Sequence, residues 1–131
     1  SQGKLWAIAI ERPKLSADAN EGFDWVIDLD NQAMATSGDY RSYFEMDGNI
    51  YSHEIDPRTG YPSRTGVASA TVIAPNCTDA DALATALMLM PITDGLKLVE
   101  SIPKTEAFII KRQPEDRFTY HQSSGINIRP Y

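Results

Sequence analysis

The sequence is poor in cysteine and in long apolar runs. Its 131 residues include one cysteine, Cys77, so no disulfide can form within the chain and a zinc site built from several cysteines is excluded. No apolar run approaches the roughly 18–20 residues that a helix needs to cross a membrane. Because Cys77 has no cysteine partner in the sequence, we expect it to be a half-buried structural thiol.

Positive charge is also scarce. Lys and Arg total 12 against 18 Asp and Glu, which gives a formal net charge of −6. Such a surface repels polyanions, so we expect neither a nucleic-acid partner nor bulk binding to an anionic membrane. A phosphate-bearing ligand would need cations gathered at one place, or a bound metal ion.

Glycine-rich nucleotide-binding loops are absent as well. The sequence contains neither the GxxxxGK[ST] phosphate loop nor the GxGxxG dinucleotide fingerprint. It also has no internal repeat and no low-complexity linker. A chain of this length is therefore expected to form one domain or part of one.

Apolar periodicity and turn residues predict strands on either side of a helical region. Asp47-Gly48 lies between two β-rich segments, which is typical of a hairpin. The small-residue stretch "NQAMATSGD" at 31–39 is assigned to no strand or helix. The expected strands are 5–11, 23–29, 41–46, 49–55, 67–74, 106–112 and 118–122, followed by an extended segment at 126–131.

Two helices are expected in the middle of the chain. The first runs from residue 79 to about residue 90, with Thr78 as N-cap and Asp81 completing a capping box. The second covers 94–101, with Thr93 as its cap.

This order of elements predicts an α+β fold in which an antiparallel sheet packs against helices. Trp6, Trp25 and the apolar face of the first helix are expected to lie in the core.

One helix face carries a candidate metal site. Asp81 and Thr85 are four residues apart, so their oxygen atoms lie on the same face, and oxygen ligands suit a hard cation such as Mg²⁺. The same residues also have purely structural explanations. Asp81 can be the acid of a capping box, and Thr85 can bond its own helix backbone.

The segment "YSHEIDPRTG" at 51–60 concentrates ionisable side chains beside one turn. His53 is suited to accept a proton, or it can be a structural strand histidine. Asp56 and Thr59 can satisfy turn backbone. Arg58 can be a solvated charge or a clamp for phosphate. These alternatives stay open on spacing alone, and the other histidine, His121, is assigned no role.

A second candidate loop precedes that segment. Ser37, Gly38 and Asp39 lie in a small-residue stretch where backbone can approach a ligand closely, although an ordinary β-turn explains the same residues.

Five segments follow one another in a characteristic order: "WAIAIERP" at 6–13, "ATSGDY" at 35–40, "YSHEIDPRTG" at 51–60, "ASATVIA" at 68–74 and "ADALATAL" at 80–87. In this order they resemble the ApbE family, the FAD:protein FMN transferases. The resemblance covers nearly all of residues 4–90 and is looser beyond. It implies the C-terminal part of the ApbE-type flavin transferase fold.

The resemblance implies an enzyme that uses Mg²⁺ to cleave the pyrophosphate of FAD. FMN would pass to a Thr or Ser hydroxyl of a partner flavoprotein, and AMP would be released. Some members of the family hydrolyse FAD to FMN and AMP instead. A flavin- or nucleotide-binding module without turnover, or a structural scaffold, is the alternative.

The resemblance also implies roles for particular residues. His53 matches the histidine that assists the acceptor hydroxyl, and Asp81 and Thr85 match the helix-borne metal ligands. The remaining candidates for FAD binding, in the "TSGD" segment and the "DPRTG" turn, are Ser37, Gly38, Asp39, Asp56, Arg58 and Thr59.

Relatives in this family are more than twice as long, so we expect residues 1–131 to be the C-terminal part of one transferase domain. The N-terminal half of the same protein would supply the other wall of the FAD site and strands that pair with 5–11 and 23–29. The isolated chain is then expected to be inactive. The parent protein would lie on the periplasmic side of the inner membrane, held by a lipid anchor outside this chain.

Overall fold

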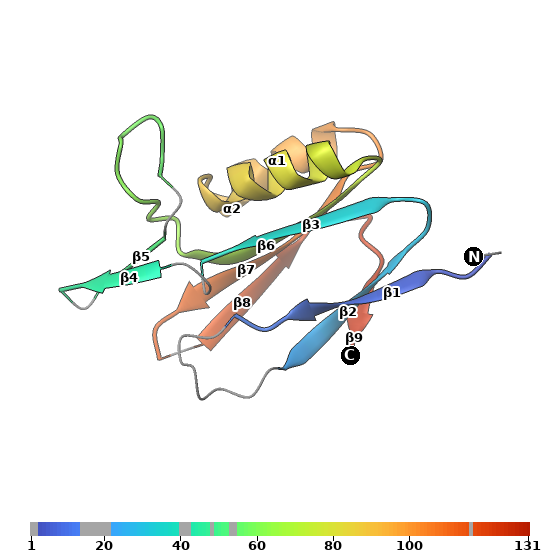
Figure 1. Cartoon of the computed structure of the whole chain (residues 1–131), viewed down its shortest axis with the longest axis horizontal. Coiled ribbons are helices and arrows are strands. Elements are labelled where there is room, and N and C mark those ends of the chain that lie inside the picture. The colour runs from blue at the N-terminus through green and yellow to red at the C-terminus, as the bar shows by residue number, and fades with distance from the viewer. Residues whose placement is uncertain (1–2, 14–21, 40–42, 48, 53–54, 116) are drawn as a thin grey trace.

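The computed structural model describes residues 3–13, 22–39, 43–47, 49–52, 55–115 and 117–131. In this part of the chain, three antiparallel sheets and two helices form the structure (Figure 1). The strands are β1 (Trp6–Glu11), β2 (Phe23–Leu29), β3 (Ala33–Gly38), β4 (Tyr43–Met46), β5 (Asn49–Ser52), β6 (Val67–Ala74), β7 (Glu106–Gln113), β8 (Arg117–Gln122) and β9 (Ile128–Pro130), and the helices are α1 (Cys77–Met88) and α2 (Ile92–Ser101).

The sheets and helices form layers. The central sheet has the order β3-β6-β7-β8, and α1 and α2 cover one of its faces (Figure 1). The second sheet, β1-β2-β9, packs on the opposite face, and the β4-β5 hairpin projects from one end. The expected α+β class is therefore confirmed.

Strand β6 lies at the centre of both apolar cores. All eight of its residues are buried, because β3 and β7 flank it and other elements cover both its faces. Its alternate residues Ala70, Val72 and Ala74 belong to the helix-side core, and Ile73 belongs to the core between the sheets. A continuous apolar run of eight residues suits a strand that is buried on both sides.

Several predicted elements are confirmed, and β2 and β6 have the predicted bounds. No strand was predicted within 31–39, whereas Ala33–Gly38 forms β3 and pairs with β6 along its whole length. β2 was also predicted to pair with strands outside the chain, whereas it pairs with β1 on one side and with β9 on the other.

The predicted caps of both helices were wrong. Asn76, not Thr78, caps α1: its side-chain oxygen accepts a hydrogen bond from the Asp79 backbone N–H at 2.9 Å, and its amide donates to the Asp79 carboxylate at 2.9 Å. This reciprocal pair places the helix start two residues before the predicted one. Helix α2 starts at Ile92 without a side-chain cap, so Thr93 lies inside its first turn.

The two tryptophans have different environments. Trp25 packs against Phe108 and Tyr120, with ring centroids 5.8 and 5.5 Å apart, and joins the core between the sheets. Trp6 is 65% exposed, so its predicted place in the core was wrong. Cys77 is exposed as well, which corrects the expected half-buried thiol. Neither helix of the described structure has the length and apolar character required to cross a membrane.

The two tryptophans provide a matched test of this packing. Trp25→Ala removes three-way aromatic contact and should lower the free energy of unfolding by about 2 kcal/mol or more. Trp6→Ala should change it by less than about 1 kcal/mol, because an exposed ring loses little contact. Urea unfolding of the two variants measures the difference, and equal losses would contradict the packing described.

Candidate functional site

Helix α1 and strand β3 together form a hollow of about 610 Å³, here called the α1–β3 hollow. Asp81 and Thr85 line it from consecutive turns of the helix, and Ala35 lines it from the strand. The Ser37 hydroxyl, two residues further along β3, lies 3.2 Å from the Thr85 hydroxyl. The lining also includes Thr78 and Cys77, so the hollow has one carboxylate, the hydroxyl groups of Thr78 and Thr85 and one thiol, with the Ser37 hydroxyl beside Thr85.

The structural alternatives for the two helix residues can now be compared with the geometry. The capping acid of α1 is Asp79, so Asp81 lies beyond the cap. The Thr85 hydroxyl contacts Ser37 on the neighbouring strand. Both side chains are exposed at the hollow. Oxygen donors of this kind fit a hard divalent cation such as Mg²⁺, which keeps several of its own water ligands. The described residues bring no three His, Cys, Asp or Glu side chains into one metal-binding group.

The other residues of the "TSGD" segment take structural roles. Ser37 and Gly38 end strand β3, so the expected loop was wrong there. Asp39 is buried and accepts a hydrogen bond from Arg112 Nη2 at 2.8 Å. The Arg112 guanidinium also lies over the Phe118 ring, 5.5 Å from its centroid. This partly buried ion pair joins the end of β3 to β7, across β6.

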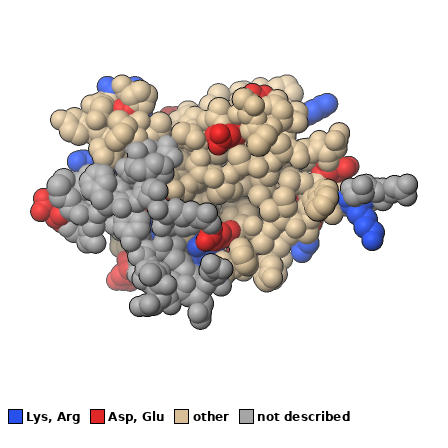
Figure 2. Space-filling view, viewed as in Figure 1, with Lys and Arg blue, Asp and Glu red and all other residues tan. Residues whose placement is uncertain are grey.

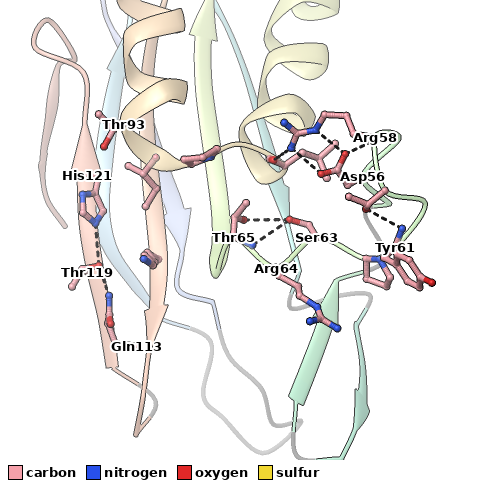
Figure 3. Close-up of a pocket in the computed structure, with 16 residues that line it drawn as sticks. Asp56, Arg58, Tyr61, Ser63, Arg64, Thr65, Thr93, Gln113, Thr119 and His121 are labelled. Atoms are coloured by element: carbon pink, nitrogen blue, oxygen red, sulfur yellow. Dashed lines mark hydrogen bonds and ion pairs between the residues drawn. The ribbon is translucent and has the colours of Figure 1, made fainter.

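A second cavity of about 1060 Å³ lies at the other edge of the central sheet and is here called the β8 pocket (Figure 3). One wall is most of the 56–65 loop, and the floor is the α1–α2 connection with Ile92 and Thr93. The opposite wall comes from β7 and β8, through Lys111, Gln113, Thr119 and His121. Sequence reasoning predicted the wall that contains Asp56, Arg58 and Thr59 but missed the β7–β8 wall, whose only local signal is polar residues at alternate positions on the helix-facing side of two strands.

The "DPRTG" residues lie in the β8 pocket, where they shape the turn. The Asp56 carboxylate accepts from Arg58 Nε at 3.0 Å, from Arg58 Nη2 at 2.8 Å and from the Arg58 backbone at 2.9 Å. The Thr59 hydroxyl accepts from the Tyr61 backbone at 3.2 Å. Arg58, first through its side chain and then through its backbone, lowers the pKa of Asp56 below its ordinary value.

The same loop is attached to the C-terminal end of α1. The hydroxyl groups of Ser63 and Thr65 both donate to the Met88 carbonyl at 2.8 Å, and Arg58 Nη2 lies 3.4 Å from the Leu89 carbonyl. Carbonyl groups at a helix end have no partner within the helix, so these donors satisfy them.

The structure thus divides the predicted site residues between two places. Asp81 and Thr85 line the α1–β3 hollow, and Ser37 contacts Thr85 beside it. Asp56, Arg58 and Thr59 line the β8 pocket instead. Gly38 and Asp39 line neither cavity as described. His53 lies outside the described residues.

Comparison with known proteins decides the family. A model of the ApbE family matches residues 1–109. The chain belongs to the ApbE family. Two similar ApbE-family relatives are the FAD:protein FMN transferases of Haemophilus influenzae, 46% identical over 99 residues, and of Vibrio cholerae, 42% identical over 124 residues. These alignments cover 76% and 95% of this chain, but 28% and 36% of the relatives.

Solved ApbE structures share the fold. The flavin transferase ApbE from Vibrio cholerae is similar with a TM-score of 0.71 and 39% identity over 91% of this chain and 36% of that one. The ApbE protein from Thermotoga maritima gives a TM-score of 0.71 and 37% identity over 92% of this chain and 37% of that one. The chain therefore spans about a third of the length of these ApbE proteins.

The Asp56–Arg58 pair of this ApbE-family chain predicts a defined pH dependence. Arg58→Gln should raise the Asp56 pKa part of the way back to its ordinary value of about 3.9, because the backbone donor remains. A lowered folded-state pKa stabilises the fold above the unfolded-state pKa, and this contribution is lost as the pH falls through the lowered value. Wild type and variant should therefore differ in thermal stability near pH 6 and converge in acid.

Carboxyl ¹³C NMR titration measures these pKa values directly. Arg129→Gln is the control, since Arg129 lowers the pKa of Asp28 in the same way at a distant place. That variant should raise the Asp28 pKa and leave Asp56 unchanged. An Asp56 pKa that does not respond to Arg58→Gln would contradict the pairing.

Proposed function

We propose that this chain forms part of an Mg²⁺-dependent FAD:protein FMN transferase and that the α1–β3 hollow receives the phosphate end of FAD. The observation that carries the proposal is the contact between the Ser37 and Thr85 hydroxyls beside Asp81. The names of similar ApbE proteins support the substrate and the reaction class. An oxygen-lined hollow offers what an acidic chain otherwise lacks, a place where phosphate can bind through a cation.

The proposed reaction transfers the FMN phosphoryl group from the bridging oxygen of the FAD pyrophosphate to a hydroxyl oxygen of the acceptor protein. The acceptor hydroxyl oxygen of a Thr or Ser side chain forms a bond to the phosphorus on the FMN side of the FAD pyrophosphate. The bond from that phosphorus to the bridging oxygen breaks, and AMP leaves with the bonding electrons. His53 takes the proton of the acceptor hydroxyl, since an imidazole titrates near neutral pH.

The chain's own residues would hold and orient the reactants. Asp81 and Thr85 would hold Mg²⁺, which when bound neutralises charge that develops on the phosphates. Ser37 lies 3.2 Å from Thr85 and would fix the direction of its hydroxyl. The partly buried Asp39–Arg112 pair would keep the end of β3, and therefore Ser37, in register with β6.

The proposal assigns this chain one part of the site. Since it spans about a third of similar transferases, we propose that the N-terminal half of the same protein supplies the other wall for FAD. We further propose that the parent protein is lipid-anchored on the periplasmic side of the inner membrane, where it meets its acceptor flavoprotein.

If Asp81 and Thr85 hold Mg²⁺, substitutions at these two positions of α1 should raise the Mg²⁺ requirement by different amounts. In the full transferase, Asp81→Ala should raise the Mg²⁺ concentration required for half-maximal activity at least tenfold, because a charged ligand is lost. Thr85→Val should have a smaller effect. Asp79→Ala is the matched control: it removes a carboxylate that contacts the Asn76 cap, so helix stability should fall while the Mg²⁺ requirement stays unchanged. The assay follows flavinylation of an acceptor during Mg²⁺ titration, and wild-type Mg²⁺ dependence in both site variants would refute the assignment.

The proton-transfer assignment has a separate test. His53→Asn should lower FMN transfer by roughly 10²–10⁴-fold, the usual contribution of a general base, while FAD affinity changes much less. A pH–rate profile distinguishes the base from a structural histidine, since the variant should lose the acidic limb. If that limb persists, another group accepts the proton. Release of free FMN without transfer to the acceptor would favour FAD hydrolysis as the activity.

A further inference from the structure

Arg112 is a cation that the fold holds in its interior. On the face drawn in Figure 2, the visible Lys and Arg side chains of the described residues lie singly at the surface. The Arg112 side chain is instead only 15% exposed, and its Nη2 donates to the Asp39 carboxylate at 2.8 Å. A guanidinium carries N–H donors on each of its nitrogens, and buried donors are normally hydrogen-bonded.

Two polar atoms in this part of the central sheet are buried and have no hydrogen-bond partner among the residues that the structure describes. They are Arg112 Nη1 and the hydroxyl oxygen of Ser69. Ser69 is 1% exposed, so bulk water does not reach its hydroxyl. A buried donor that makes no hydrogen bond costs free energy. Each of the two atoms therefore requires a further partner.

Strand register places Ser69 and Arg112 on the same face of the sheet. Side chains alternate along a strand, so Ser69 lies on the side of Ile73 in β6 and Arg112 on the side of Ile110 in β7. Both isoleucines belong to the core between the two sheets. The Cα partner of Ser69 is Ile110, which makes Arg112 the diagonal neighbour of Ser69. A long side chain can reach a diagonal neighbour.

The Arg112–Asp39 ion pair crosses β6 close to Ser69. Asp39 follows the end of β3, and its backbone N–H donates to the Ala68 carbonyl of β6 at 3.0 Å. Because β6 lies between β3 and β7, the guanidinium and the carboxylate meet over β6. The register shift before Ser69 turns Val67 to the helix-side core, so Val67 does not separate Ser69 from the ion pair.

We propose that Ser69, Arg112 and Asp39 form a binding site for one ordered water molecule within the core between the sheets. The water oxygen accepts hydrogen bonds from the Ser69 hydroxyl and from Arg112 Nη1. The water donates to the Asp39 carboxylate, whose oxygens can each accept more than one hydrogen bond. About three polar partners are typical of a buried water molecule.

The charge of this site favours water over an ion. Asp39 already neutralises Arg112, so an anion would meet the carboxylate and a cation would meet the guanidinium. A further buried charge without its own counter-ion is strongly unfavourable. A neutral molecule that both accepts and donates hydrogen bonds satisfies all three groups.

Trp25 Nε1 provides an internal contrast. It is also buried without a hydrogen-bond partner among the described residues, but it belongs to an indole that packs against the rings of Phe108 and Tyr120. A single donor beside aromatic rings does not offer the several polar partners that hold a buried water molecule. No ordered water is expected at Trp25.

The water links three neighbouring strands of the central sheet. It contacts β6 through Ser69, β7 through Arg112 and the end of β3 through Asp39. None of these three residues lines the α1–β3 hollow or the β8 pocket. The proposal therefore requires neither the metal nor the transfer of FMN.

A crystal structure of the full transferase tests the site directly. A density peak should lie about 2.7–3.2 Å from both the Ser69 hydroxyl and Arg112 Nη1, with no such peak at Trp25 Nε1. The peak should disappear in Ser69→Ala. Thr71→Val is the matched control and should keep the peak, because the buried Thr71 hydroxyl of the same strand contacts Thr36 at 2.8 Å.

A double-mutant cycle tests the same link in solution. Ser69→Ala removes one donor, and Arg112→Lys removes Nη1 while keeping a positive charge beside Asp39. Each should lower the midpoint of thermal unfolding by about 2–4 °C. The double variant should lose clearly less than the sum, since either substitution alone already releases the shared water. The control cycle of Thr71→Val with Arg112→Lys should be additive.

Four results would overturn the proposal: no peak between the two atoms in wild type, a direct hydrogen bond between Ser69 and Arg112, additive losses in the Ser69–Arg112 cycle, or an anomalous peak at the site in crystals grown with bromide. The last result would identify an anion in place of water. Because no measurement involves FAD, Mg²⁺ or an acceptor, the outcome is independent of the flavinylation assay.

Discussion

The burial of β6 on both faces is the constraint on which the rest of the structure depends. The strand is hydrogen-bonded to β3 on one side and to β7 on the other, and it takes part in both apolar cores. Its register sets where β3 ends and where Lys111 and Arg112 emerge from β7. The hollow at one edge of the sheet and the pocket at the other are therefore positioned by the same strand.

Some of this architecture could be predicted because local patterns were strong. β6 is an uninterrupted apolar run that ends at Pro75, and β2 alternates clearly, so both had the predicted bounds. β3 could not be found in this way, since "AMATSG" has little intrinsic strand preference and becomes a strand through pairing with β6. The cap of α1 was ambiguous because Asn76 and Thr78 are both good N-cap residues, and only the backbone geometry separates them.

The candidate site was predictable to the same limited extent. The spacing of Asp81 and Thr85 places them on one helix face, whatever the helix packs against. Their contact with Ser37 could not be predicted, because it depends on how α1 docks on a strand 48 residues earlier in the chain. The Asp39–Arg112 pair spans 73 residues, and the β8 pocket joins four separate segments. Contacts of this range are set by topology rather than by local pattern.

Alanine forms much of the contact between α1 and the central sheet, and this has a consequence for how the family can vary. Ala80 and Ala84 on the helix face a core that includes the strand residues Ala70, Ala74 and Ala107. Small side chains set the distance between a helix and the surface beneath it, and close packing leaves no space for extra methyl groups. A larger residue at any of these places would lift the helix and separate Thr85 from Ser37, although it touches neither hydroxyl. Buried alanines that take no part in the chemistry thus determine the width of the hollow. A related sequence that keeps the oxygen-bearing side chains can still lose the geometry of the hollow if substitutions accumulate at these buried alanine positions.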